Sequence, residues 1–170
     1  MTSSTDLTLR DAGLADIDSL TSFAIAMAWE TEHKRLHPDT VHRGIAVVLN
    51  EPIRGRYFIA ERGGERVGTL MLTYEWSDWR CADWWWIQSV YIVESARRSG
   101  VFRALYQHAH ALCEAAPGVC GLRLYVERDN QRAQATYAAL GMQDAGYLVF
   151  EQGLPWLAEV IRKDGGAGAT

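Results

Sequence analysis

The residues best suited to chemistry lie in a short arginine-rich segment, Arg97–Phe102, between an apolar run and an amphipathic pattern. Three arginines, Arg97, Arg98 and Arg103, bring positive charge to the start of an expected helix. Backbone N–H groups at a helix start have no partner within the helix, and the helix dipole favours an anion there. Gly100 would let the backbone approach such an anion closely. A phosphate-binding turn and a plain strand-to-helix turn with solvated arginines fit this local chemistry equally well.

The same segment does not match the best-known nucleotide-binding turns. It lacks the GxxxxGK(S/T) pattern, so triphosphate hydrolysis is not indicated. It also lacks GxGxxG, and it lies too late in the chain for the first turn of a dinucleotide-binding fold. The net charge of −4 argues against a large contact area with nucleic acid. We therefore expect no nucleic-acid partner.

No pattern of metal ligands or paired cysteines accompanies the turn. Cys81, Cys113 and Cys120 form an odd set without CxxC spacing, which argues against a disulfide framework and a zinc site. His108 and His110 lie two residues apart on an expected helix and would face different sides of it. The amino terminus has no apolar signal region, and the longest apolar run is too short to cross a bilayer. We expect a cytoplasmic protein with no metal and no membrane partner.

Patterns of apolar residues predict the elements that must position the turn. A buried strand, Trp84–Val93, is apolar at both parities and should precede it, and an amphipathic helix from Gly100 should follow it. Further strands are expected at Leu7–Arg10, Tyr57–Ala60, Val67–Thr73, Leu122–Val126 and Tyr147–Phe150. Further helices are expected from about Asp16, at Pro38–Leu49 and at Asn130–Leu140.

This order of elements predicts one α/β domain over residues 1–170. Two strand–helix–strand units in the carboxyl-terminal half would place parallel strands in the middle of a mixed sheet. We expect six to seven strands flanked by about four helices. Residues from about 155 onward should form a tail that is mobile from Gly165 to Thr170.

Tryptophan is concentrated in one part of the chain. Six of the seven tryptophans lie between Trp29 and Trp86, and five of them lie within residues 76–86. Aromatic filling of the core is the favoured interpretation. An aromatic wall beside a ligand pocket is the alternative.

Two segments together carry a family pattern. Residues 90–106, VYIVESARRSGVFRALY, contain Arg97-x-x-Gly100. Residues 126–142 contain, at the spacing N-x2-A-x3-Y-x3-G, Asn130, Ala133, Tyr137 and Gly141. The first segment resembles motif A of the GNAT superfamily of N-acetyltransferases, (Q/R)-x-x-G-x-(G/A), and the second resembles its motif B. The resemblance covers nearly the whole chain in its order of elements, with the specific motifs in residues 84–142.

The resemblance implies acetyl-CoA as the co-substrate. Backbone groups of Val90, Tyr91 and Ile92 would contact the pantetheine arm. Asn130 would hydrogen-bond the cofactor beyond the point where the two strands beside it separate. The pyrophosphate would lie on the turn, whose residues are Arg97, Arg98, Ser99, Gly100, Val101, Phe102 and Arg103.

The turn departs from the family pattern at Phe102, where the superfamily has Gly or Ala. The change keeps the backbone N–H, so an anion can still bind. We expect the Phe102 ring to point into the core, as its spacing with Tyr106 and Cys113 indicates.

Transfer of an acetyl group from a thioester needs a neutral amine, a stabilised oxyanion and a proton for the departing thiolate. By resemblance, Tyr137 supplies that proton, because a phenol of pKa about 10 can donate to a thiolate and recover its proton later. Direct transfer in a ternary complex is expected, since Cys113 lies in the middle of a helix with no evident base.

A general base is harder to assign. Some family members carry a glutamate on the fourth strand, and the matching position here is Trp86. Its neighbours on that face, Trp84 and Gln88, cannot accept a proton either. The amine would then lose its proton through water to a remote carboxylate, or need no strong base if its own pKa is low. The remote candidates, each favoured as a solvated surface carboxylate, are Glu30, Glu32, Glu75 and Glu127.

The resemblance also indicates where the acceptor would lie. Trp86 and Gln88 would line the strand side, and the Glu30–His37 segment between the first two helices would form the other wall. Glu30 and Glu32 could bind an ammonium there, with a cation–π contact from Trp86. We predict an N-acetyltransferase for a primary amine of a small molecule or peptide, with a homodimer as a further expectation from relatives. The alternatives are a non-catalytic acyl-CoA sensor and a transferase for another acyl-CoA.

Overall fold

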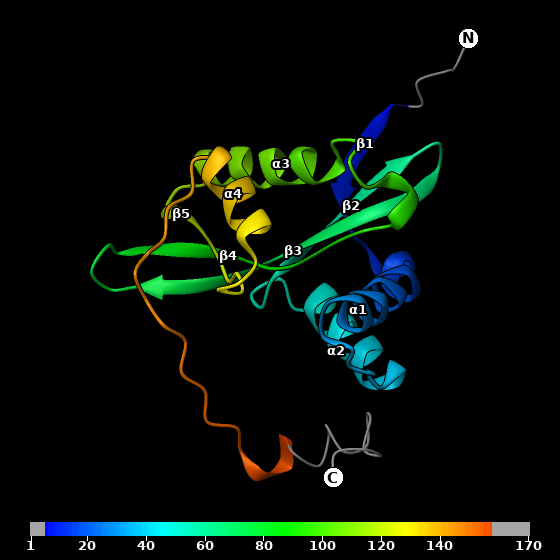
Figure 1. Ribbon diagram of the computed structural model, residues 1–170, viewed down its shortest axis with the longest axis horizontal. Helices are drawn as coiled ribbons and strands as arrows, with labels where there is room; N and C mark the ends of the chain where they lie inside the picture. Colours follow the sequence, from blue (N-terminus) through cyan, green and yellow to red (C-terminus); the bar gives the residue numbers. More distant parts are fainter. Residues whose placement is uncertain (1–5, 158–170) are drawn as a thin grey trace. The chain divides into compact units, whose positions relative to one another are not determined.

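The computed structural model of the protein describes residues 6–157 (Figure 1). These residues form two compact units, the chain up to Arg123 and the chain from Leu124 onward. Five strands form one sheet in the order β1-β2-β3-β4-β5. They are β1 (Leu7–Asp11), β2 (Arg56–Arg62), β3 (Glu65–Ser77), β4 (Ala82–Ile92) and β5 (Val119–Leu124). The α-helices in the described residues are α1 (Ile17–Glu32), α2 (Pro38–Asn50), α3 (Val101–Ala115) and α4 (Gln131–Ala139), joined by two 3-10 helices, η1 (Leu14–Asp16) and η2 (Glu94–Ala96).

The helices confirm the apolar patterns that predict them. The stripe of α3 is buried, with Val101 1% exposed and Leu105 and Ala109 fully buried. Pro38 is the first residue of α2, where its missing N–H costs nothing. Among residues 6–157, no helix is both long enough and apolar enough to cross a membrane.

The prediction of six to seven strands is wrong, because the described residues form five. Tyr147–Phe150 forms no strand, and its side chains are 62% to 89% exposed. A strand needs a hydrogen-bonded neighbour, and the described residues after β5 contain no second strand for this segment. β5 also ends before Tyr125 and Val126, which were expected within it.

β3 and β4 form a longer hairpin than the sequence pattern predicts. Part of the Glu75–Asp83 segment, which lies between the two predicted strands, continues the pairing, with Glu75 opposite Trp84. Tyr74 lies opposite Trp85, with ring centroids 5.8 Å apart. Aromatic cross-strand pairs of this kind stabilise antiparallel strands, so only a short turn remains between β3 and β4.

Helices cover both faces of the sheet in the first unit (Figure 1). α3 packs on one face, where Phe58 of β2 meets His108 of α3 with ring centroids 5.0 Å apart. α1 and α2 pack on the other face, where Leu20, Ile45 and Ile59 form a buried cluster. Burial of each large apolar side chain contributes about 1.5–3 kcal/mol, so apolar packing holds both layers to the sheet.

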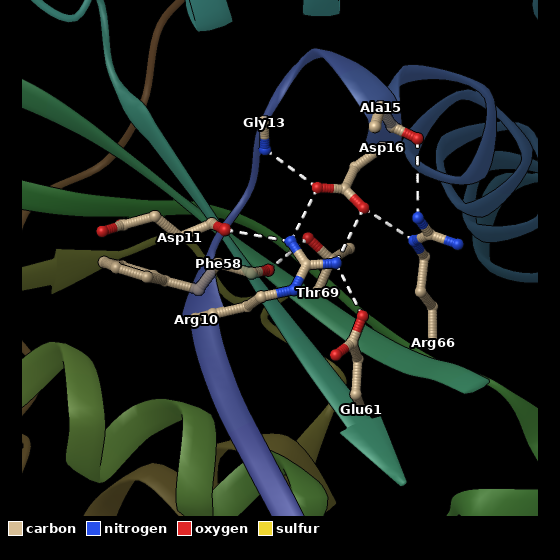
Figure 2. Close-up of polar contacts among 9 residues, drawn as sticks. All are labelled: Arg10, Asp11, Gly13, Ala15, Asp16, Phe58, Glu61, Arg66 and Thr69. Carbon is tan, nitrogen blue, oxygen red and sulfur yellow. Dashed lines mark hydrogen bonds and ion pairs between the residues drawn. The ribbon is translucent and has the colours of Figure 1, made fainter. Parts of the chain in front are cut away.

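A buried polar network fixes the start of α1 on the sheet (Figure 2). Asp16, from which a helix is expected, lies at the N-cap position of α1, but its carboxylate, 2% exposed, does not cap that helix. It accepts hydrogen bonds from Arg10 Nη1 at 2.7 Å, from Arg66 Nε at 2.6 Å and from the Gly13 N–H at 2.8 Å. Arg10 also donates to Glu61 at 2.6 Å. These donors, Arg10 above all, hold the pKa of Asp16 well below its usual range. We call these five residues the Asp16 network.

The second unit contains α4 and, at the end of the described residues, a short helical stretch at residues 155–157. Asn130 is the N-cap of α4, and the Asn130 Oδ1 accepts the Ala133 N–H at 3.0 Å. Gly141 follows the helix in the left-handed region with φ +89°. The predicted helix is confirmed, and Gly141 is the residue after which its path ends.

Candidate functional site

A β-bulge divides β4 in the middle. Met71 of β3 lies opposite Ser89 of β4. The next β3 residue, Leu72, lies opposite Ile87, which leaves Gln88 as an extra residue in β4. Such a bulge shifts the alternation of side chains along the strand by one residue. It depends on the register with β3, so no local sequence pattern predicts it.

Because of the bulge, Trp84 and Trp86 share a face of β4 with Tyr91. Tyr91 packs against Phe23 of α1 with ring centroids 5.4 Å apart, so this is the face that α1 covers. In a regular strand, Trp86 and Tyr91 would point to opposite faces. Trp86 therefore lies on the face of the sheet that α1 covers, whereas Gln88 is exposed at the bulge itself.

β5 runs beside the first half of β4 only. Near the start of both strands, the Asp83 N–H donates to the Gly118 carbonyl at 2.8 Å. Farther along, the Arg123 guanidinium lies 4.1 Å from the Trp84 ring centroid and 6.0 Å from that of Trp86. The contacts advance in the same direction along β4 and β5, so the two strands are parallel. β5 ends one residue after Arg123. The part of β4 beyond it includes the predicted pantetheine residues Val90, Tyr91 and Ile92.

After η2 the chain enters α3 through the predicted turn. Arg98 has φ +61° and Gly100, the N-cap of α3, has φ +84°, so both are left-handed. Gly100 has no side chain to cap α3, and the amide groups of the first helical turn have no acceptor within the helix. Ser99 Oγ donates to the Ala96 carbonyl at 2.6 Å and accepts from Arg62 at 2.9 Å. The turn thus presents backbone donors at the positive end of α3.

The Arg97 side chain is held by β4 and α1 together. Its Nε donates to the Ile92 carbonyl at 3.0 Å, and its Nη2 donates to one oxygen of Glu30 at 2.5 Å. The Tyr91 hydroxyl donates to the other Glu30 oxygen at 2.9 Å. The hydrogen bonds from Tyr91 and Arg97 lower the pKa of Glu30, and the Glu30 carboxylate raises the pKa of Arg97. We call these four residues the Glu30 cluster. It joins three predicted cofactor residues to one predicted acceptor residue.

Glu30 and Glu32 lie in the last turn of α1, and not in a loop as expected. α1 continues until His33, whose backbone is left-handed with φ +52°. Glu32 forms a surface ion pair with Lys34. The structure therefore brings Glu30, but not Glu32, to the predicted cofactor residues.

Phe102 lies along the buried stripe of α3. Its side chain is half-buried, and its ring centroid lies 6.3 Å from that of Tyr106. Tyr106 and Cys113 are themselves 5% and 6% exposed. The Phe102 ring therefore packs beside Tyr106 at the edge of the core, and not fully inside it as its spacing predicts.

A second carboxylate lies beside the tryptophans of β4. Glu75 on β3 accepts from the Trp86 indole N–H and from Arg123 Nη1, the latter at 3.1 Å. Arg123 in turn covers the Trp84 ring. Gly121 makes room for that ring, since its φ is +155° and a Cβ there would lie 2.5 Å from Trp84. Glu75, one of the remote proton acceptors considered above, is therefore the ion-pair partner of Arg123.

The tryptophans do not all fill the core. Trp84, Trp85 and Trp86 are partly buried on β4. Trp76 and Trp79 are 62% and 87% exposed at the end of the β3–β4 hairpin, which is the end of β4 away from the arginine-rich turn. Core filling is therefore the wrong interpretation for these two residues.

The second unit carries the predicted catalytic residue. Asn130, Ala133 and Tyr137 lie on one side of α4, because their spacing follows the helical period. Burial raises the pKa of the Tyr137 phenol, so this group is protonated at neutral pH. Asn130 is the N-cap of α4, and the preference for Asn at N-caps could have predicted this role.

Within residues 6–157, no three side chains of the metal-binding types come together. The three cysteines are free thiols. Cys113 is buried, and burial raises the pKa of its thiol, which makes a thiolate at this position less accessible.

Comparison with known proteins links this geometry to one family. The sequence profile of the Acetyltransferase (GNAT) family matches residues 17–142. The solved structure of a possible acetyltransferase from Clostridium difficile 630 is 36% identical, with a TM-score of 0.82, over 87% of this chain and 97% of that chain. The aminoglycoside N-acetyltransferase AAC(6′)-Iy, solved in complex with CoA, is 15% identical with a TM-score of 0.72, over 90% of this chain and 98% of that chain, a likeness of fold alone. No curated protein sequence matches the chain.

Proposed function

Because the chain belongs to the Acetyltransferase (GNAT) family, we propose that it moves an acetyl group from acetyl-CoA to a primary amine of a small molecule or peptide. The observation that supports this most directly is the turn after β4, where Arg98 and Gly100 are left-handed and α3 begins without a side-chain cap. Such a helix start is suited to the pyrophosphate of a CoA thioester.

We assign the cofactor to the free edge of β4 and to the turn. Val90, Tyr91 and Ile92 lie beyond β5. The backbone groups of Val90 and the N–H of Ile92 point away from β3 and can pair with the pantetheine amides as a neighbouring strand would, whereas Tyr91 pairs with Thr69 of β3 and the Ile92 carbonyl already accepts Arg97 Nε. The pyrophosphate would accept hydrogen bonds from the amides of Arg98–Arg103. Asn130 would donate to the cofactor through Nδ2 while its Oδ1 caps α4.

In the proposed reaction, the amine nitrogen attacks the thioester carbonyl carbon directly, and the carbon–sulfur bond breaks. The departing thiolate takes the proton of the Tyr137 phenol, which later recovers a proton from solvent. The surplus proton of the amine passes to water. This route is supported by Trp86, which cannot accept a proton, and by Glu75, which is already paired with Arg123.

We further propose that a single domain performs the whole reaction in the cytoplasm without a metal ion. The family match, which runs from residue 17 to residue 142 across both units, supports one domain. The scattered histidines and the odd number of cysteines support metal-free chemistry. Acceptor contacts from Glu32, Trp86 and Gln88, and a homodimer, stay predictions.

A binding measurement followed by an acceptor screen tests this function. Acetyl-CoA should raise the melting temperature of the protein. Release of the CoA thiol should then appear with a polyamine, an amino acid, an aminoglycoside or a peptide amino terminus. Binding without thiol release from any amine would favour the acyl-CoA sensor, and faster release from succinyl-CoA would favour another acyl donor. A melting temperature unchanged by every acyl-CoA would contradict the proposal.

A further inference from the structure

We propose that Glu30 is a positioning residue for the cofactor: it locks Arg97 onto the carbonyl of Ile92 and so holds the phosphate-binding turn in its binding shape. The inference rests on the proposed function for the identity of the ligand, because CoA is the molecule that the turn would receive. The effect of Glu30 on the turn itself does not depend on that identity.

The Glu30 cluster connects three separate elements at the entrance to the turn. Glu30 lies in the last turn of α1, Ile92 ends β4, and Arg97 directly follows η2. The Arg97 guanidinium is bonded at two points, with Nε on the Ile92 carbonyl and Nη2 on Glu30. A long side chain bonded at two points loses most of its rotamer freedom, and the planar guanidinium makes such a double contact directional. Arg97 is therefore fixed relative to both β4 and α1.

The next residue shows why this fixation matters. Arg98 has φ +61°, a conformation that residues with a side chain rarely adopt and that persists only where the neighbours determine it. On one side, Arg97 is anchored by Glu30 and Ile92. On the other side, Ser99 is anchored by hydrogen bonds to Ala96 and Arg62, at 2.6 Å and 2.9 Å. Releasing the Arg97 anchor would let Arg98 relax and move the amide groups that are to meet the phosphates.

Simple electrostatics predicts the opposite change in affinity, so the direction in which the Kd for CoA changes on removal of Glu30 tests the inference. Glu30 offsets the positive charge of Arg97, and both side chains are 40% exposed. If charge alone mattered, removing Glu30 would raise the positive potential at the turn and strengthen the binding of an anion. If Glu30 positions Arg97, removing it weakens that binding, because the turn must first be ordered.

The first experiment measures the Kd for CoA by calorimetry. Glu30→Gln keeps the shape of the side chain but not its charge, and we expect the Kd to rise about tenfold. In an Arg97→Gln background the same change should have no effect, because Glu30 acts through Arg97. Glu30→Asp should restore part of the affinity. The matched control is Glu51→Gln, which removes an exposed carboxylate that pairs with Arg54 at 2.5 Å, and its Kd should equal that of the unchanged protein.

The second experiment measures the NMR order parameters of the backbone amides of residues 98–101 in the protein without CoA. They should be lower in Glu30→Gln and unchanged in Glu51→Gln. A Kd for CoA that is unchanged or lower in Glu30→Gln, or order parameters that are unchanged, would overturn the positioning role. If the unchanged protein binds no CoA, the proposed function fails, and the order parameters still decide whether Glu30 orders the turn.

Discussion

Two carboxylates at opposite ends of α1 hold arginines from other elements, and they differ above all in exposure. Asp16, at the start of the helix, is 2% exposed and binds Arg10 and Arg66. Glu30, in the last turn, is 40% exposed and binds Arg97. Water can replace a partner that Glu30 loses, but it has little access to Asp16. The same pairing of a carboxylate with arginine can therefore stabilise the fold at one end of a helix and, in our proposal, order the turn after β4 at the other.

The largest effect on stability is expected from Asp16→Asn. The variant leaves Arg10 and Arg66 facing a neutral amide in a buried position, and we expect the free energy of unfolding to fall by about 3 kcal/mol. Urea denaturation measures this loss. Asp18→Asn, which alters a side chain that is 97% exposed, is the control. A loss below about 1 kcal/mol would mean that Asp16 contributes no more to the free energy of unfolding than an exposed ion pair does, and it would remove the contrast with Glu30.

Tyr137→Phe tests whether a half-buried hydroxyl contributes to turnover without contributing to the stability of the fold. Losing the phenol proton should lower kcat about 100-fold, equivalent to about 2.7 kcal/mol in the barrier. The free energy of unfolding should change by less than about 1 kcal/mol. Thiol release and urea denaturation measure the two quantities. Tyr147→Phe, at a residue 81% exposed, is the control, and full turnover in Tyr137→Phe would remove this residue from the proton-donor role.

Acid should weaken the Asp16 end of α1 selectively. The pKa of Asp16 is lower in the folded protein than the unfolded value of about 3.9, so its contribution is present above that value and is lost as the pH falls further. The stability gap between the unchanged protein and Asp16→Asn should therefore narrow by about 1–2 kcal/mol between about pH 5 and pH 2. Urea denaturation at several pH values tests this. A gap that is independent of pH would contradict the assigned pKa direction.

The smallest effect on stability is expected from Glu30→Gln. Exposed ion pairs contribute little to folding, so the free energy of unfolding should fall by less than about 0.5 kcal/mol, even as the affinity for CoA declines. Urea denaturation of the protein used in the calorimetry measures it. A fall as large as that of Asp16→Asn would make Glu30 a second structural carboxylate.

The elements that the sequence predicts well are those with local signals. The apolar stripe of α3, Pro38 at the start of α2 and Gly141 after α4 each act within a few residues, so their pattern is visible in the chain. The turn at Gly100 was likewise found from its residue types, and its left-handed backbone agrees with the choice of glycine.

The features that sequence patterns miss depend on contacts between distant parts of the chain. Glu30 and Arg97 are 67 residues apart, so no local pattern shows that they meet. The role of Asp16 as a buried ligand of Arg10 and Arg66 depends on how β1 and β3 are placed beside η1. Tyr147–Phe150 shows the reverse error, because its apolar composition favours a strand although the described residues supply no neighbour.

The extra residue at Gln88 restricts the number of residues that β4 can have between Trp86 and Tyr91. Deleting it would restore regular alternation and turn the indoles of Trp84 and Trp86 toward α3 if Tyr91 kept its place. That side is already filled, with Leu105 of α3 fully buried. If the indoles kept their place instead, Tyr91 would turn away from Glu30. The middle of β4 should therefore tolerate substitutions far better than insertions or deletions. Relatives that keep both the indoles and the contact between Tyr91 and Glu30 on the α1 face should show no length variation at this point.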